Sequence, residues 1–261
     1  ALTVLSIQKQ ALAHGMSLKD SSAYNIQYLN GKPILIDTLS FEAYSEGKPW
    51  VAYRQFCQHF LAPLALICYC DIRLNQLLQI NVDGIPLDLA TALLPLRARI
   101  NLNLYVHLYL HAAAQKKFAG QSLESSNDRN TVKKTGILGI IDSLEIVIRK
   151  LSWNPGESSW ANYAINHNYS DTSFEHKKHL VTKYLEIAQP NTVWDLGANT
   201  GIFSRLSSKL GIQTLAFDND PGAVEKNYRQ CVSENERHLL PLFLDLANPS
   251  PGIGWHNHER S

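Results

Sequence analysis

Short apolar runs alternate with helical patterns in the last third of the chain. The runs at 192–194, 213–217 and 239–244 have the length and composition of buried strands. Between them, residues 201–210 and 221–230 show helical spacing, and Pro221 falls in a first turn, where its missing N–H costs nothing. Strand–helix alternation of this kind predicts an α/β fold with a doubly wound parallel sheet.

The first 119 residues follow a different pattern, mainly helical with one hairpin. Helical spacing ends near Gly15, and Asn30-Gly31 then separates two strand-like runs, 24–29 and 33–37, as in a two-residue β-hairpin. Residues 50–118 are mostly helical in pattern. The stretch 102–110 also alternates strictly, as a strand would, but Leu104 and Leu108 keep a four-residue step and good helix formers follow, which favours a helix.

A polar segment divides the chain. Residues 120–136 contain almost nothing to bury and predict a linker or mobile loop. An apolar helix at 137–151 and an amphipathic helix at 174–188 come next. We therefore expect a helical region with a hairpin at 1–119, a linker at 120–136 and a second domain at 137–261.

Composition narrows the class of protein. The 261 residues carry 24 Lys plus Arg and 23 Asp plus Glu, and 45% are hydrophobic, which excludes a disordered chain. The net charge of +1 argues against nucleic acid or an acidic membrane surface as the main partner. The most apolar run, 60–70, contains Pro63 and is too short to span a membrane. The cysteines at 57, 68, 70 and 231 form no disulfide pattern, and we expect buried, reduced thiols in a cytoplasmic protein.

Acidic residues follow each predicted strand of the parallel sheet. Asp195 leads into a glycine-bearing turn with Gly197 and Gly201, Asp218 follows the second strand and Asp245 the third. Such a turn lets backbone approach a ligand closely, and an acid after the second strand is placed to bind ribose hydroxyls. Asp245 is suited to accept a hydrogen bond from an adenine amino group. The pattern predicts a site for an adenosine-containing cofactor.

These three segments, VWDLGANTG, AFDND and LFLDL, resemble the first three motifs of class I S-adenosylmethionine-dependent methyltransferases. The resemblance covers about residues 160–261 and implies a Rossmann-like methyltransferase domain. Asn199 replaces the middle glycine, a mild departure because Asn tolerates positive φ, and one that weakens a dinucleotide-binding interpretation. The resemblance implies S-adenosylmethionine as cofactor, with the glycine turn at its methionine moiety, Asp218 at the ribose, and Asp245 with Leu246 at the adenine. The residues so implied are Asp195, Gly197, Ala198, Asn199, Gly201, Asp218, Asn219, Asp245 and Leu246.

The resemblance also implies that part of the sheet is missing. In that family further strands follow the third, whereas only 16 residues follow Asp245 here. We expect a fragment that lacks most of the surface for the methyl acceptor, so the catalytic residues stay unassigned, and small molecules, glycans and proteins all stay open as acceptors. The first strand would then be an unpaired edge, which offers a route to oligomers.

Two alternatives stay open at this stage. A non-catalytic binding or scaffold module derived from a methyltransferase would keep the same motifs. At the other end of the chain, Asp20, Asn25 and Asp37 resemble the catalytic loop of kinase-like phosphotransferases in spacing. Lys19 replaces the expected preceding residue, and polar residues around a hairpin are the favoured explanation.

Two smaller features of the sequence have plain structural explanations beside functional ones. His107 and His111 could share a helix face as metal ligands do, but no acid or thiol completes the set, so we expect a polar helix face and no metal site. Residues 168–171 lie where related enzymes cover the cofactor, and Asp171 could equally cap the helix that follows it.

Overall fold

The computed structural model describes residues 1–112, 131–155, 170–249, 252 and 255–258. The chain divides into two compact units, each described here by itself. The N-terminal unit comprises Ala1–Gln27, Pro33–Trp153 and Pro251–Ser261, and the C-terminal unit comprises Tyr28–Lys32 and Asn154–Ser250. The mixed α/β architecture confirms the fold class in outline, with helices prevailing early in the chain and a parallel sheet near its end.

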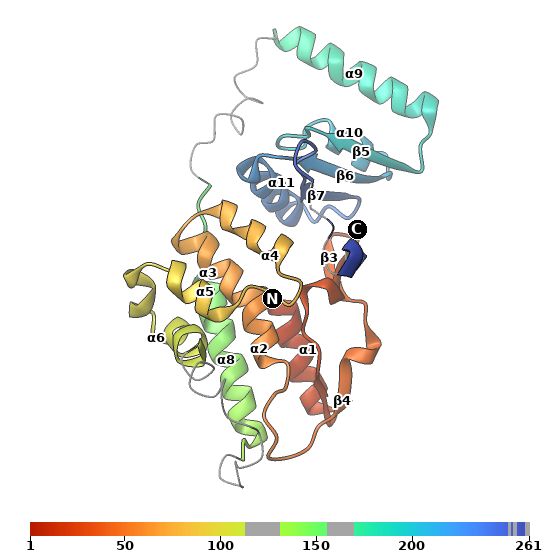
Figure 1. Ribbon diagram of the computed structural model, residues 1–261. Helices are drawn as coiled ribbons and strands as arrows, with labels where there is room; N and C mark the ends of the chain where they lie inside the picture. Colours follow the sequence, from red (N-terminus) through yellow and green to blue (C-terminus); the bar gives the residue numbers. More distant parts are fainter. Residues whose placement is uncertain (113–130, 156–169, 250–251, 253–254, 259–261) are drawn as a thin grey trace. The chain divides into compact units, whose positions relative to one another are not determined.

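The N-terminal unit is mainly helical, as its pattern predicted (Figure 1). Its α-helices are α1 (Leu2–Ala13), α2 (Tyr53–Phe56), α3 (Ala62–Tyr69), α4 (Leu77–Ile80), α5 (Leu87–Leu93), α6 (Leu102–Leu104) and α8 (Lys134–Lys150). π-Helical segments at Cys57–Leu61 and Tyr105–Leu110 continue α2 into α3 and prolong α6. The ambiguous stretch 102–110 is thus helical, because Leu104 and Leu108 are fully buried one turn apart.

The chain before α2 also forms two short strand pairs. Strands β2 (Ile26–Leu29) and β3 (Lys32–Leu35) form the predicted hairpin. Asn30 and Gly31 between them both have positive φ, 51° and 73°, as a type I′ turn requires. Strands β1 (Met16–Leu18) and β4 (Phe41–Ala43) pair antiparallel. This second pair was not predicted, since three-residue strands show no periodicity.

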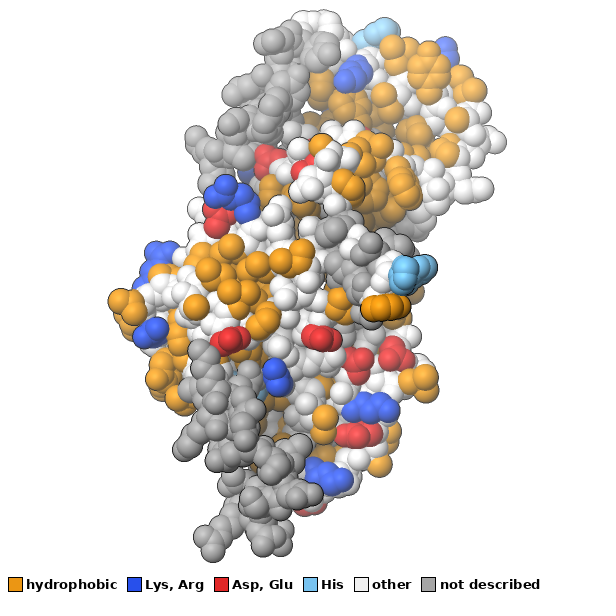
Figure 2. All heavy atoms as spheres, in the orientation of Figure 1, with side chains coloured by type: hydrophobic (Ala, Val, Ile, Leu, Met, Phe, Trp, Pro, Cys, Tyr) orange, Lys and Arg blue, Asp and Glu red, His pale blue; other side chains and the backbone are white. Residues whose placement is uncertain are grey.

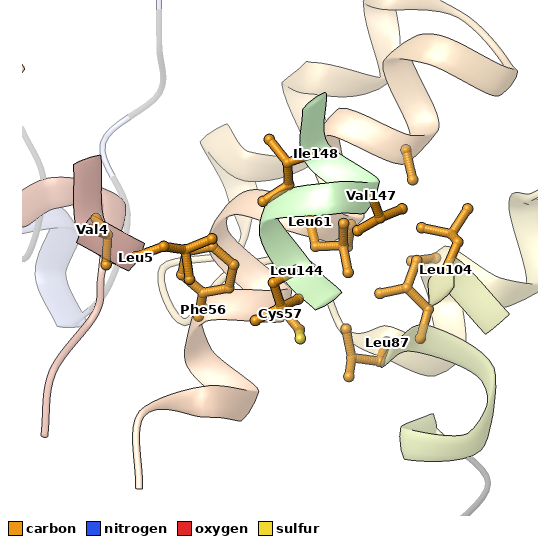
Figure 3. Packing of buried hydrophobic residues seen from close by; sticks show 14 of the residues in the cluster. Val4, Leu5, Phe56, Cys57, Leu61, Leu87, Leu104, Leu144, Val147 and Ile148 are labelled. Carbon is orange, nitrogen blue, oxygen red and sulfur yellow. The ribbon is translucent and has the colours of Figure 1, made fainter. Parts of the chain in front are cut away.

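The core of the N-terminal unit gathers large aliphatic and aromatic side chains from helices far apart in the sequence. Figure 3 shows Leu5 of α1 beside Phe56 of α2, with Leu144 and Val147 of α8 elsewhere in the same core cluster. All four are fully or almost fully buried. Lys9 on α1 adds ion pairs to Asp142 and Glu145 of α8 at 2.8 and 2.9 Å.

The boundary between the two units differs from the one that we expected. We expected the second domain to begin at residue 137, but α8 belongs to the N-terminal unit, where Ile137, Ile141 and Leu144 join the core. An amphipathic helix shows which of its faces is apolar but not which domain buries that face. The boundary between the units lies after Trp153, and much of the expected linker falls in residues 113–130, outside the described part.

In the described part of the C-terminal unit, three parallel strands form a sheet in the order β5-β6-β7. They are β5 (Thr192–Leu196), β6 (Gln213–Asp218) and β7 (Leu239–Phe243), linked by α10 (Ser204–Lys209) and α11 (Pro221–Ser233) and preceded by α9 (Asp171–Ala188). Every element matches its predicted position to within a few residues. This confirms the predicted parallel sheet with intervening helices, which is consistent with a partial Rossmann-like region.

Burial alternates along these strands because only one face of the sheet is well covered. Thr214 and Ala216 of β6 are buried, and α10 and α11 pack against the sheet. On the opposite face Trp194 of β5 is 67% exposed, with its ring edge-on to Phe217 at 5.5 Å. Figure 2 shows hydrophobic side chains on the surface of this unit. Within the described residues β5 pairs only with β6.

Candidate cofactor-binding site

The turn after β5 has the backbone conformation that its sequence predicted. Gly197, Asn199 and Gly201 have φ values of 80°, 51° and 81°. Asn199 therefore takes the left-handed conformation in place of a glycine, as we expected from its tolerance of positive φ. Gly201 has a second constraint, because a Cβ built there would lie 2.5 Å from Asn227 Oδ1 and 2.7 Å from Asn227 Cγ. Only glycine lets the turn approach α11 this closely.

Every backbone amide of this glycine loop, defined here as Gly197–Gly201, donates a hydrogen bond within the protein. Two of them share one acceptor at the end of β6, and one reaches the side chain of Asp218. The bonds are Gly197 N and Ala198 N to Phe217 O (both 2.9 Å), Asn199 N to Asp218 Oδ2 (2.7 Å), Thr200 N to Asn199 Oδ1 (2.8 Å) and Gly201 N to Ala198 O (2.9 Å). The loop is therefore ordered by the protein itself.

The three predicted acids lie at the carboxyl ends of adjacent strands. Asp195 at the end of β5 accepts a 2.6 Å hydrogen bond from Ser204 Oγ at the start of α10. Asp218 accepts from Asn199 through Oδ2 and from Asp220 N, at 2.8 Å, through Oδ1. The chain after β7 stays beside β6, since Leu244 N donates to Asp218 O at 3.0 Å. The structure thus brings the glycine loop, Asp218 and the segment leading to Asp245 together at the carboxyl ends of the strands, which we call the carboxyl edge of the sheet.

The third acid stabilises its own turn. Asp245 Oδ1 accepts from Ala247 N at 2.9 Å and from Asn248 N at 3.1 Å. Leu246 beside it is 65% exposed, and Asn219, after Asp218, is exposed as well. Both side chains are open to a ligand at this edge. Ala198, by contrast, is 7% exposed and belongs to the small core of the unit.

The carboxylates at this edge can accept more hydrogen bonds than they do. An ionised carboxylate has about four acceptor positions, and within the described residues Asp218 and Asp245 each use two for backbone amides. The vicinal hydroxyls of a ribose and the amino group of an adenine are donors of the kind that would use the remaining positions. The donor and acceptor chemistry of the edge therefore fits an adenosine moiety.

Sequence reasoning missed the residues that support the loop from behind. Arg205 in α10 donates from Nη1 to Thr200 O at 2.7 Å, and it lies 3.3 Å from Glu236 Oε2 as an ion pair. Asn227 packs against Gly201. A buried arginine has no local signature, but its place in the first turn of the helix after the glycine loop was a usable hint.

A cavity of about 120 Å³ in the same unit lies elsewhere. Its lining includes Tyr228 and Cys231 of α11 and Leu239 and Leu240 at the start of β7. That is the amino end of the strand, opposite the edge with the three acids. The cavity is therefore not the site that the motifs indicate.

The kinase-like residues at the start of the chain form local turns. Asp20 accepts from Ser22 N at 2.9 Å, and Asp37 accepts from Leu39 N at 2.8 Å, each two residues ahead. Ser40 Oγ joins Asn25 to Asp37, at 3.1 and 2.7 Å, and its hydrogen bond lowers the pKa of Asp37. These contacts order the hairpin region and account for the polar residues there.

The predicted polar helix face at His107 and His111 is wrong for His107. His107 is 2% exposed, and its ring nitrogens lie 2.7 Å from Tyr53 Oη and 2.8 Å from Ser143 Oγ. His111 stacks on the Tyr53 ring at 5.0 Å. Burial lowers the pKa of His107 to about 4. Both ring nitrogens are thus occupied by protein partners rather than presented to a metal.

Further features concern the metal-ligating side chains, the helices and the cysteines of the described residues. Within them, no group of three metal-ligating side chains gathers in one place, and no helix could cross a membrane. The four cysteines are free, but the expected burial holds only for Cys57 and Cys231, since Cys68 is half-buried and Cys70 is exposed. Residues 168 and 169 lie outside the described part. Ser170 rather than Asp171 caps α9, accepting from Ser173 N, and Asp171 is the first residue of the helix.

One comparison with known proteins covers both units. The chain is similar to nodulation protein NoeA of Rhizobium meliloti (strain 1021), with 33% identity over 264 residues that include all of this chain and 55% of that protein. The chain therefore spans about half the length of this relative. No family model matches the chain, and a search of solved structures gave no significant match. The similarity extends through the helical N-terminal unit and the parallel sheet together.

Proposed function

We propose that the C-terminal unit binds S-adenosylmethionine and that the protein is a methyltransferase. The observation that supports this proposal is the closure of the glycine loop by Asp218, with Asp245 following the next strand at the same edge. A carboxylate at the end of the second strand is placed to accept from ribose hydroxyls. Asp195 and the loop would face the methionine moiety, and Asp245 with Leu246 would flank the adenine.

The hydrogen bonds of the loop favour this cofactor over a dinucleotide. A pyrophosphate is bound by backbone N–H groups that point at it from a glycine-rich turn and a helix N-terminus. Here the five amides of the loop already donate to protein acceptors, and the Asp218 carboxylate lies at Asn199 N. A phosphate would meet a negative charge where it needs donors, whereas the cationic sulfonium of S-adenosylmethionine suits acidic surroundings.

When bound, S-adenosylmethionine supplies an electrophilic methyl group to a nucleophilic acceptor. The residues of this chain bind and orient the cofactor, which is the larger part of catalysis when a reaction is a direct displacement between aligned partners. The loop, fixed by Asp218 and by Ser204 through Asp195, provides a rigid surface for that orientation.

Calorimetric titration with S-adenosylhomocysteine tests the proposal. We expect the 261-residue chain to bind it, and Asp218→Ala to abolish binding. Asp245→Asn should weaken binding while keeping an oxygen for the amides of Ala247 and Asn248. Asp220→Asn is the matched control, because it changes a neighbouring acid but can still cap α11 at Gly222 N.

Two results would count against the proposal. A folded chain that binds no S-adenosylhomocysteine would favour a scaffold module that keeps the sheet without the ligand. Binding of NADH in place of S-adenosylhomocysteine would show that the loop accepts a pyrophosphate after all.

A further inference from the structure

Arg205 is a buried charge directly behind the glycine loop. Its side chain is 8% exposed, and its guanidinium contacts three parts of the C-terminal unit. It donates to Thr200 O in the loop at 2.7 Å and to Asn227 O in α11 at 3.3 Å, and it pairs with Glu236 between α11 and β7. Arg205 thus cross-links the loop to the helix and to the turn before β7.

Stability alone does not account for this arrangement. A buried ion pair is often no more stabilising than apolar side chains of the same volume, because both charges lose their hydration. The Glu236 side chain is only 11% exposed, so the pair is withdrawn from water on both sides. A leucine or methionine at position 205 would fill the space without that cost.

The orientation of the guanidinium follows the loop rather than the ion pair. Nε lies 3.3 Å from Glu236 Oε2, yet neither atom makes a hydrogen bond within the described residues. The short, well-formed bond is the one to the Thr200 carbonyl. The side chain is therefore aligned for the loop, and Glu236 serves to balance its charge.

The carbonyl of Thr200 is a sensitive point of the loop. It precedes Gly201, where an added Cβ would clash with Asn227. The amide of Thr200 itself donates to Asn199 Oδ1. Holding this carbonyl fixes the peptide plane between Thr200 and Gly201. The orientation of that plane sets how the rest of the loop faces a ligand.

We propose that Arg205 is the positioning residue of the cofactor site, which holds the glycine loop in its binding conformation through Thr200. This inference rests on the proposed function, since the affinity that it controls is that for S-adenosylmethionine. Arg205 acts through the loop and not by contact with the cofactor.

Arg205→Lys is the first test, because lysine keeps the charge opposite Glu236 but cannot hold two carbonyls with one planar group. We expect its affinity for S-adenosylhomocysteine to fall at least tenfold, as measured by calorimetry. Arg229→Lys is the matched control: Arg229 lies on the exposed side of α11, paired with Glu225, and its replacement should leave affinity within twofold of wild type. The double variant Arg205→Gln/Glu236→Gln removes both charges together, so it leaves no buried charge unpaired, and it should show the same loss of affinity.

Hydrogen exchange of the ligand-free protein gives a readout that does not depend on the cofactor. In Arg205→Lys, the amides of Asn199, Thr200 and Gly201 should exchange faster while those of β6 keep their wild-type protection. Wild-type affinity in either the lysine variant or the double variant would overturn the inference, as would equal loss of protection in the loop and in β6. A wild-type chain that binds no S-adenosylhomocysteine would instead refute the proposed function, whatever the exchange shows.

Discussion

Replacing Gly201 with alanine should destabilise the C-terminal unit by two separable amounts. The residue has φ 81°, and an L-residue in the left-handed region costs about 1–2 kcal/mol. The added Cβ would also lie 2.7 Å from Asn227 Cγ, inside any normal contact distance. Overpacking of this kind costs a further 1–3 kcal/mol, roughly, so we expect a total of about 2–5 kcal/mol.

The chain offers a control that isolates the backbone contribution. Gly211 has φ 80°, and nothing lies within 4 Å of a Cβ built there. Gly211→Ala should therefore cost only the conformational part, about 1–2 kcal/mol. Adding Asn227→Ala to Gly201→Ala removes the atoms that the new methyl group meets, so the double variant should recover the steric part, less whatever Asn227 itself contributes.

Urea unfolding, monitored through the hydrogen exchange of the amides in β6, measures the free energy of unfolding of the C-terminal unit in each variant. If Gly201→Ala were no more destabilising than Gly211→Ala, the result would contradict the close contact between the loop and Asn227 of α11. If the Asn227 replacement gave no recovery, the clash would have to come from another neighbour.

The N-terminal unit gives two further predictions. His107 has a pKa near 4 when folded and 6.5 when unfolded, so its contribution is complete above pH 6.5 and is lost progressively down to pH 4. The loss is at most about 3 kcal/mol, and the difference between the unfolding free energies at pH 7 and pH 4.5 should shrink by up to that amount in His107→Gln but not in a variant of the exposed His14. Gly84→Ala should lower the urea midpoint far more than Gly15→Ala. Both residues have positive φ, but only at Gly84 would the Cβ meet backbone, 2.8 Å from the carbonyl carbon of Gln58, and equal midpoints would contradict that contact.

Local signals in the sequence were sufficient for the elements of the parallel sheet. Strand length, the first-turn position of Pro221 and the Asn30-Gly31 turn each have a direct conformational cause, and the structure confirms all of them. The glycine loop was found for the same reason, since Gly197 and Gly201 are required by backbone conformation. What depends on one segment alone can be predicted from that segment.

The features that were missed depend on partners distant in the sequence. Nothing near His107 indicates that Tyr53 and Ser143 will bind its two nitrogens, 54 and 36 residues away. Arg205 is buried against Glu236 and the Asn227 carbonyl, which lie beyond the next strand in the sequence. The helix now called α8 has the right pattern for either unit, and its partner α1 lies at the other end of the N-terminal unit.

The separation of α1 and α8 along the sequence also determines when the N-terminal unit can fold during synthesis. Lys9 and Glu145 are separated by 136 residues. At about 5–20 residues per second, the ribosome takes on the order of 7–27 s to supply α8 after α1 has been made. Throughout that interval the apolar side of α1, including Leu5 and Leu12, lacks its final cover and is available to chaperones. The described strands of the C-terminal sheet lie between Thr192 and Phe243, and their pairing meets no comparable delay.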